Sequence, residues 1–246
     1  MSSDNKIEFN DGKITVHKSK ITEILAGKLS EDDIKFSEQI VTENMKKRKL
    51  FLEILTSNNC KDCLELNNSY SSKCLNRPAP YGSMSSDIVF VNKIPTELEC
   101  VMSLSHSDSV SYFLMLIIRK LGLNPDDFYF TDFIKCPSKN ISEESCWHCV
   151  VNYFLKEISY IQPKAIVFQG LSAIKILSSG NILLDIPDNI EYGIIYDSYL
   201  VTKDRPVKIL GIYDLNMVLQ KEGVELQQCK NVIWQNLSSI VKSVQS

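Results

Sequence analysis

The chain has 246 residues, of which 44% are hydrophobic and 23% charged, and its formal net charge is −3. This composition is typical of a globular protein, and the small negative charge argues against a protein that coats nucleic acid through overall attraction, although a local basic groove remains compatible with it. No apolar run of about 18 residues is present, so we expect no membrane span. The polar first residues predict an intracellular protein, cytoplasmic or nucleoid-associated, that is not secreted.

The first 57 residues are predicted to form an N-terminal extension. Short alternating apolar runs at residues 7–9 and 14–16 flank Asp11 and Gly12, a pattern that predicts a hairpin. Leu, Ile, Lys and Glu at helical spacing predict helices in residues 19–57. We therefore divide the chain into an extension, residues 1–57, and a main domain, residues 58–246.

The main domain is predicted to begin with a long loop. Asn, Ser, Pro and Gly recur through residues 58–86, which favours irregular structure. Cys60, Cys63 and Cys74 all fall in this stretch. A loop of this length needs something other than a hydrophobic core to order it.

From residue 87 onward, short apolar strands alternate with helices. This alternation predicts a three-layer α/β/α fold with a short, mostly parallel central sheet. Ligands bind such sheets at the carboxyl ends of the strands, which here are residues 92–97, 132–136, 169–170 and 214–216. The predicted strands are residues 87–91, 128–134, 165–168 and 207–213, and the predicted helices are residues 110–121, 142–161, 171–177 and 229–244.

Five of the eight cysteines are spaced as metal ligands. Two Cys-x-x-Cys pairs and one cysteine after a predicted strand could supply four thiolates to an iron–sulfur cluster. Zinc is the alternative, held by the two pairs or with His148, and buried cysteines without any metal are the third interpretation. The five are Cys60, Cys63, Cys136, Cys146 and Cys149.

Several segments, in order, resemble the iron–sulfur (family 4) uracil-DNA glycosylases. The resemblance covers about residues 50–242 and implies a uracil-DNA glycosylase-like fold and DNA as a partner. It also implies a structural 4Fe–4S cluster on Cys60, Cys63, Cys136 and either Cys149, which fits the family's spacing better, or Cys146. The matching segments are Cys60-Lys61-Asp62-Cys63-Leu64, the strand at residues 87–91, residues 121–136, which end in Lys135-Cys136, and residues 161–177 around Gln169 and Gly170.

The first active-site motif of that family is altered in this chain. Asn92-Lys93-Ile94-Pro95-Thr96 stands where the family has Gly-Glu-Ala-Pro-Gly, so only Pro95 is retained. Lys93 occupies the position of the acid and cannot orient a water molecule as a carboxylate does. Glu97 or Glu99 could substitute for it.

The remaining pocket positions are altered as well. Asp132 replaces the asparagine that reads uracil, and an ionised Asp accepts hydrogen bonds but cannot donate one. Asp214, followed by Leu215 and Asn216, replaces the catalytic histidine segment. His106 lies where the family has a stacking aromatic residue, and we predict it to be a solvated loop residue that could alternatively stack on a base.

Three functions fit the sequence. The first is a non-catalytic uracil-DNA glycosylase-like protein that binds DNA, or a protein partner through its N-terminal extension, in replication or repair. The second is an active glycosylase that removes uracil or another altered base, with Asp132 and Asp214 as candidate catalytic residues. The third is a zinc-stabilised α/β protein unrelated to DNA.

Overall fold

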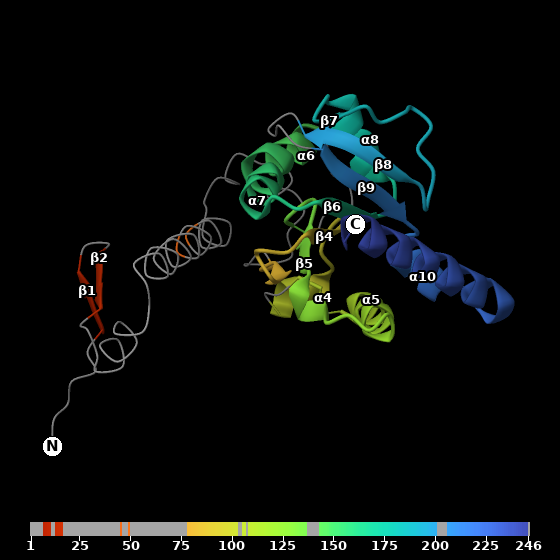
Figure 1. The fold of residues 1–246 in the computed structure, drawn as a ribbon, viewed down its shortest axis with the longest axis horizontal. Helices are drawn as coiled ribbons and strands as arrows, with labels where there is room; N and C mark the ends of the chain where they lie inside the picture. The colour runs from red at the N-terminus through yellow and green to blue at the C-terminus, as the bar shows by residue number, and fades with distance from the viewer. Residues whose placement is uncertain are drawn as a thin grey trace, which may run out of the picture. The chain divides into compact units, whose positions relative to one another are not determined.

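The computed structural model describes residues 7–10, 13–16, 45, 49, 78–102, 105, 106, 108–136, 143–200 and 206–245 (Figure 1). Residue contacts divide the chain into two compact units, Met1–Lys49 and Leu50–Ser246.

The first unit contains a two-stranded hairpin. β1 (Ile7–Asn10) pairs antiparallel with β2 (Lys13–Val16), as the alternating pattern of residues 7–16 predicts. Met45 and Lys49 are helical. The rest of the helical region predicted at residues 19–57 lies outside the described residues, so the domain boundary at residue 57 stays a prediction.

A seven-stranded sheet organises the second unit, in the order β3-β5-β4-β6-β9-β8-β7. The central strands β5, β4, β6 and β9 run parallel, whereas β3, β8 and β7 each pair antiparallel with their neighbour. With helices on both sides, this sheet confirms the predicted α/β fold. The strands are β3 (Tyr81–Gly82), β4 (Ile88–Asn92), β5 (Tyr129–Asp132), β6 (Ala165–Gln169), β7 (Leu183–Leu184), β8 (Ile195–Leu200) and β9 (Pro206–Ile212).

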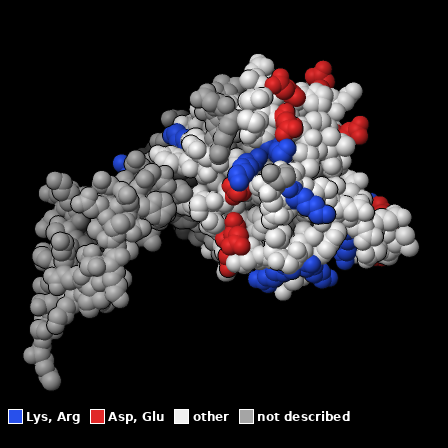
Figure 2. All heavy atoms as spheres, viewed as in Figure 1, with Lys and Arg blue, Asp and Glu red and all other residues white. Residues whose placement is uncertain are grey.

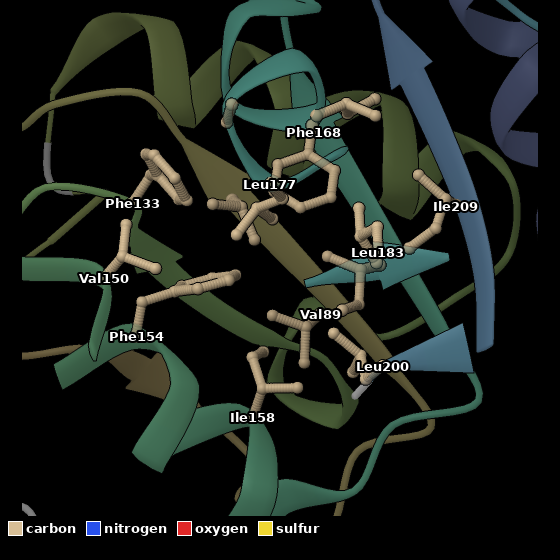
Figure 3. Packing of buried hydrophobic residues seen from close by; sticks show 14 of the residues in the cluster. Val89, Phe133, Val150, Phe154, Ile158, Phe168, Leu177, Leu183, Leu200 and Ile209 are labelled. Carbon is tan, nitrogen blue, oxygen red and sulfur yellow. The ribbon is translucent and has the colours of Figure 1, made fainter. Parts of the chain in front are cut away.

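One face of the sheet is covered by α6 (Glu143–Cys149), η3 (Val150–Phe154), α7 (Leu155–Ile161) and α8 (Ser172–Ser179). Alternate strand residues, including Val89 and Phe168, pack there against Phe154 and Leu177 (Figure 3). Because η3 is a π-helical turn, the single helix predicted for residues 142–161 is interrupted directly after Cys149.

The other face is covered by α5 (Ser109–Lys120), α9 (Leu215–Leu219) and α10 (Gly223–Gln245). Phe90 and Leu210 of the sheet belong to this second apolar cluster, together with Leu114 and Leu237 of the helices. α10 begins at Gly223, six residues before the predicted start at Cys229. The sequence pattern did not indicate these first turns because they are largely exposed and carry little apolar periodicity. Among the described residues, no helix is long and apolar enough to cross a membrane.

Candidate functional site

The parallel strands end together at one edge of the sheet. Asn92, the last residue of β4, is the register partner of Asp132, the last residue of β5. Gln169, the last residue of β6, pairs with Ile212, which ends β9 just before Asp214. The polar residues predicted for the site therefore follow neighbouring strands at the edge where ligands bind such sheets.

Glu99 is anchored beside this edge by the start of a short helix. α4 (Glu97–Met102) follows Thr96, whose backbone N–H and hydroxyl donate to Glu99 Oε2 at 2.6 and 3.0 Å. The Glu99 N–H donates in return to the Thr96 hydroxyl at 3.3 Å, which completes a capping box. The other oxygen of Glu99 accepts from the backbone N–H of His106 at 2.5 Å. Glu99 is fully buried, and its carboxylate links the backbone of Thr96 to that of His106. Glu97 is exposed.

Asp132, Ser105 and His106 form a buried hydrogen-bonded chain. The Ser105 hydroxyl donates to Asp132 Oδ2 at 2.6 Å and lies 2.8 Å from His106 Nδ1. The His106 ring lies 5.3 Å from the ring of Phe130, centroid to centroid, and its backbone adopts a left-handed φ of 59°. The prediction that His106 is a solvated loop residue is therefore wrong, because the residue is buried and its ring lies beside Phe130 of β5. We call Glu99, Ser105, His106 and Asp132 the carboxyl cluster.

Burial sets the protonation of the carboxyl cluster. It raises the pKa of Asp132 to about 8, and the negative charge of Glu99 acts in the same direction. Burial also raises the pKa of Glu99, and it lowers the pKa of His106 to about 4. At neutral pH Asp132 is therefore a neutral carboxylic acid beside a neutral imidazole, and in this form it can donate a hydrogen bond as well as accept one.

The hydrogen-bonded series Asp132–Ser105–His106 ends in one unpartnered atom on each side. Asp132 Oδ1 and His106 Nε2 are buried and make no hydrogen bond with any described residue. The side-chain atoms of Glu99, His106 and Asp132 also lie within 4.8 Å of one another, which is close enough for a metal ion. Because Glu99 already accepts three hydrogen bonds, the group is better described as a hydrogen-bonded cluster.

Gln169 and Gly170 lie at the neighbouring strand end. Both side-chain polar atoms of Gln169 are buried without a partner among the described residues. Gly170 adopts a φ of +85°, which suits glycine, and its N–H donates to the carbonyl of Ile212 at 2.9 Å. The strand end thus presents an amide that has both a donor and an acceptor to offer.

The other predicted site residues make local contacts or face solvent. Asn92 Oδ1 accepts from the Lys93 N–H at 2.9 Å, and Asn92 Nδ2 donates to the Ile94 carbonyl at 3.0 Å. Asp214 caps α9 by accepting from the Asn216 N–H at 2.9 Å. Lys93 and Asn216 are exposed, and Pro95 is buried.

The comparison with known families agrees with this architecture. Residues 79–238 match the family model described as the uracil DNA glycosylase superfamily. The chain belongs to the uracil DNA glycosylase superfamily. A comparison with curated proteins finds no match. Membership supports a DNA glycosylase-like function and an interaction with DNA.

Two of the predicted cluster ligands lie together in this superfamily fold. Cys136 follows β5, Cys149 ends α6, and both are buried. The hydrogen bond between their thiols lowers the pKa of Cys149 to about 6, and Lys135 acts in the same direction. Cys146 is buried in the same apolar cluster. Cys60 and Cys63 lie outside the described residues.

A buried ion pair lies beside these cysteines. Lys135 Nζ is 2.6 Å from Glu157 Oε2 of α7, and both side chains are almost completely buried. Lys135 Nζ also donates to the Thr131 hydroxyl at 2.6 Å, and that hydroxyl donates to Glu157 Oε2 at 2.8 Å. We call Thr131, Lys135 and Glu157 the ion-pair cluster. Successive residues of β5 point to opposite faces, so Thr131 and Asp132 serve different clusters.

Some of these contacts leave a signal in the sequence. Thr96 and Glu99 have the Thr-x-x-Glu spacing of a capping box. Glu157 interrupts an otherwise apolar helix face next to Phe154 and Ile158, which marks a buried charge in need of a partner. Ser105 carries no comparable signal, because its role depends on the loop that brings it to Asp132.

Proposed function

We propose that this chain is a DNA-binding member of the uracil DNA glycosylase superfamily that holds a nucleobase at its strand ends without excising uracil in the ordinary way. Its membership of the superfamily supports the DNA partner and the base-sized ligand. The altered residues at the strand ends support the loss of ordinary excision.

The observation that carries this proposal is the unpartnered polar edge formed by Asp132 and Gln169. Asp132 Oδ1 and both polar atoms of the Gln169 side chain are buried without partners among the described residues. Each such group costs roughly 1–3 kcal/mol of folding free energy. A ligand that pairs with these atoms removes the cost, and a base edge with carbonyl and N–H groups has the required donors and acceptors.

The chemistry required for ordinary excision has little support at the altered positions. Activation of water needs an ionised, available carboxylate, but Lys93 is an exposed cation and Asp132 is neutral at pH 7. Both carboxylate oxygens of Glu99 already accept hydrogen bonds, three in total, from Thr96 and His106. Asp214 caps a helix where the family has a histidine donor for the departing base.

The test combines binding and base release on the same oligonucleotides. Full-length protein is titrated into fluorescent single- and double-stranded DNA carrying one uracil, thymine or cytosine, and anisotropy is recorded at two salt concentrations. The same samples are treated with alkali to reveal abasic sites. We expect salt-dependent binding and no strand cleavage. Cleavage at any base would establish the active-glycosylase alternative instead, and absence of binding to all DNAs would refute the DNA-binding proposal.

A matched pair of variants tests whether the strand ends hold the base. Asp132→Leu keeps the branching of the side chain but removes its donor and acceptor, so we expect it to abolish any preference in affinity among the uracil, thymine and cytosine oligonucleotides. Asp188→Leu makes the same change at an exposed residue and should leave that preference intact. Melting curves of both variants separate loss of binding from loss of folding.

We further propose that Cys60, Cys63, Cys136 and Cys149 hold a 4Fe–4S cluster. The contact between the buried Cys136 and Cys149 side chains supports half of this ligand set. When bound, the cluster would supply a structural link between the segment of Cys60 and Cys63 and the sheet.

Anaerobic purification followed by iron, sulfide and zinc assays tests the cluster. We expect about four irons per chain, as for a four-cysteine cubane site. Cys136→Ser should lose the iron, whereas Cys229→Ser on α10 should retain it. A comparison of Cys146→Ser with Cys149→Ser identifies the fourth ligand. Stoichiometric zinc without iron, or iron retained by Cys136→Ser, would refute the proposal.

A further inference from the structure

A groove lies on the outer surface of the helices, between α5 and α10. Its volume is about 340 Å³, and its apolar lining consists of Phe113, Leu116, Ile117 and Trp234. Leu116 and Trp234 keep more than a third of their surface exposed. The groove is built by the helix layer and contains none of the strand-end residues described above.

Lysines provide all the charge in the lining of this groove. Lys120 comes from the end of α5 and Lys230 from the first half of α10, and no acidic residue lines the groove. Lys230 Nζ lies 5.5 Å from the centre of the Phe113 ring, so this positive charge is held over the apolar floor. Figure 2 shows Lys and Arg side chains gathered over the positions of α5 and the adjoining part of α10. The groove therefore favours a negatively charged occupant.

Exposed apolar side chains continue on the three helices of this layer. Tyr112 of α5 is 57% exposed, Met217 of α9 is 63% exposed, and Val224 at the start of α10 is 75% exposed. α9 packs against both α5 and α10, which brings these helices into one surface. Large apolar side chains gathered on a surface mark a protein-binding site more often than a solvated face.

We propose that the groove between α5 and α10 binds a helical segment of a partner protein that carries large apolar side chains on one face and acidic residues beside them. The apolar side chains enter between Leu116 and Trp234, and the acidic residues pair with Lys120 and Lys230. An amphipathic helix in an apolar groove is a recurrent mode of peptide recognition, and the charges add specificity and speed association.

The aliphatic content of the surface distinguishes this partner from single-stranded nucleic acid. Bases bind mainly by stacking on aromatic rings along a basic path. Phe113 and Trp234 of the groove are rings, but Leu116 in the groove offers none for stacking, nor do the exposed Met217 and Val224 outside it. A protein helix buries such side chains, whereas a polyanionic strand does not.

The test is a selection of peptides from a displayed random library on the full-length protein. The peptides span about 16 residues, roughly four helical turns. We expect the selected peptides to share acidic residues and large apolar residues spaced for one helix face. The Lys120→Glu/Lys230→Glu double variant should weaken binding of the best peptide at least about tenfold, or about 1.4 kcal/mol.

A matched control and a mapping experiment make the outcome decisive. Lys242→Glu reverses an exposed charge in the last turn of α10, outside the groove, and should leave the affinity unchanged. If the double variant fails to fold, methyl NMR of the wild-type protein replaces it, and the peptide should shift the signals of Leu116.

Four outcomes would overturn the proposal. They are a selection without a shared acidic and apolar pattern, a peptide unaffected by the double variant, oligo(dT) that displaces the peptide from Leu116, and self-association that Trp234→Glu abolishes. No step of this test depends on DNA binding or base release at the strand ends. Its failure would therefore leave the proposed DNA-binding function intact.

Discussion

The two faces of β5 carry two buried polar clusters that are completed in different ways. In the ion-pair cluster, the charge of Glu157 is balanced by Lys135 at 2.6 Å, and Thr131 bridges the two. In the carboxyl cluster, Glu99 and Asp132 share their site with a neutral imidazole, and no cation pairs with either among the described residues.

This difference separates a structural cluster from a site that can bind. A charge-balanced pair between two elements fixes their relative position, although Glu157 Oε1 has no hydrogen-bond partner among the described residues. A neutral acid with a free oxygen retains its hydrogen-bonding capacity, and it lies at the strand ends where the fold binds ligands. Variants on the two faces of β5 should therefore respond differently to charge removal and to pH.

The largest expected effect follows from breaking the ion pair. Lys135→Met leaves Glu157 buried without its cation, which should lower the free energy of unfolding by about 3–5 kcal/mol in urea titrations. The control is Lys164→Met, because the Lys164–Asp87 pair has side chains that are 53% and 55% exposed. We expect that control to lose less than about 1 kcal/mol.

The double variant Lys135→Met/Glu157→Leu sharpens the same test. Removing both charges leaves no unpaired ion, so the double variant should be more stable than Lys135→Met alone. A double variant that is as unstable as the sum of its two single variants would mean that packing, rather than charge balance, accounts for the loss.

The second effect concerns the pH dependence of the carboxyl cluster. The pKa of Asp132 rises from 3.8 to about 8 on folding, so the folded state retains a proton that the unfolded chain releases. The contribution of this proton to the free energy of unfolding is complete below pH 4 and is lost as the pH rises to about 8. The total loss is about 1.4 kcal/mol for each unit by which folding raises the pKa. Asp132→Asn should remove this loss, so its stability relative to the wild-type protein should increase between pH 4 and 8.

Urea titrations across that pH range measure this difference. Glu99, Asp108, Lys135 and Glu157 are the charged neighbours that influence the cluster, and all four remain in the variant. Equal slopes of stability against pH for the two proteins would mean that Asp132 is ionised in the folded state. That result would also remove the support for Asp132 as a hydrogen-bond donor to a base.

The smallest effect concerns the capping box that holds Glu99. Thr96→Ala removes the hydroxyl that exchanges hydrogen bonds with Glu99, which should cost about 1 kcal/mol of unfolding free energy. Thr96→Ser retains the hydroxyl and should stay close to the wild-type value. If both variants melted alike, the cap would have no measurable role in placing Glu99.

The sequence predicted the parallel part of the sheet better than its edges. β4, β6 and β9 are nearly continuous apolar runs because both of their faces are buried, and this pattern is visible without a structure. β8 (Ile195–Leu200) was missed because it mixes exposed Asp197 with buried Ser198 and Leu200 near the sheet edge. β3 and β7 are too short to produce a pattern.

The candidate site was predictable in position but not in chemistry. The strand-end rule and the family resemblance both pointed to Asp132. Its neutral state depends on Glu99 and on burial by distant loops, neither of which is local in sequence. The sequence likewise did not indicate that Lys135 pairs with Glu157. Glu157 lies on the separate helix α7, which only the folded structure places next to Lys135.

The π-helical turn η3 sets the rotational phase of the helix that carries Cys149 and Glu157. In an uninterrupted α-helix of about 3.6 residues per turn, these positions would be rotated from each other by roughly 80°. The wider turn holds about one residue more, so Cys149 and Glu157 can both face Lys135, as they do. Deletion of one residue from η3, such as exposed Val151, would therefore put the thiol and the carboxylate out of phase while leaving every side chain that contacts Lys135 in the sequence.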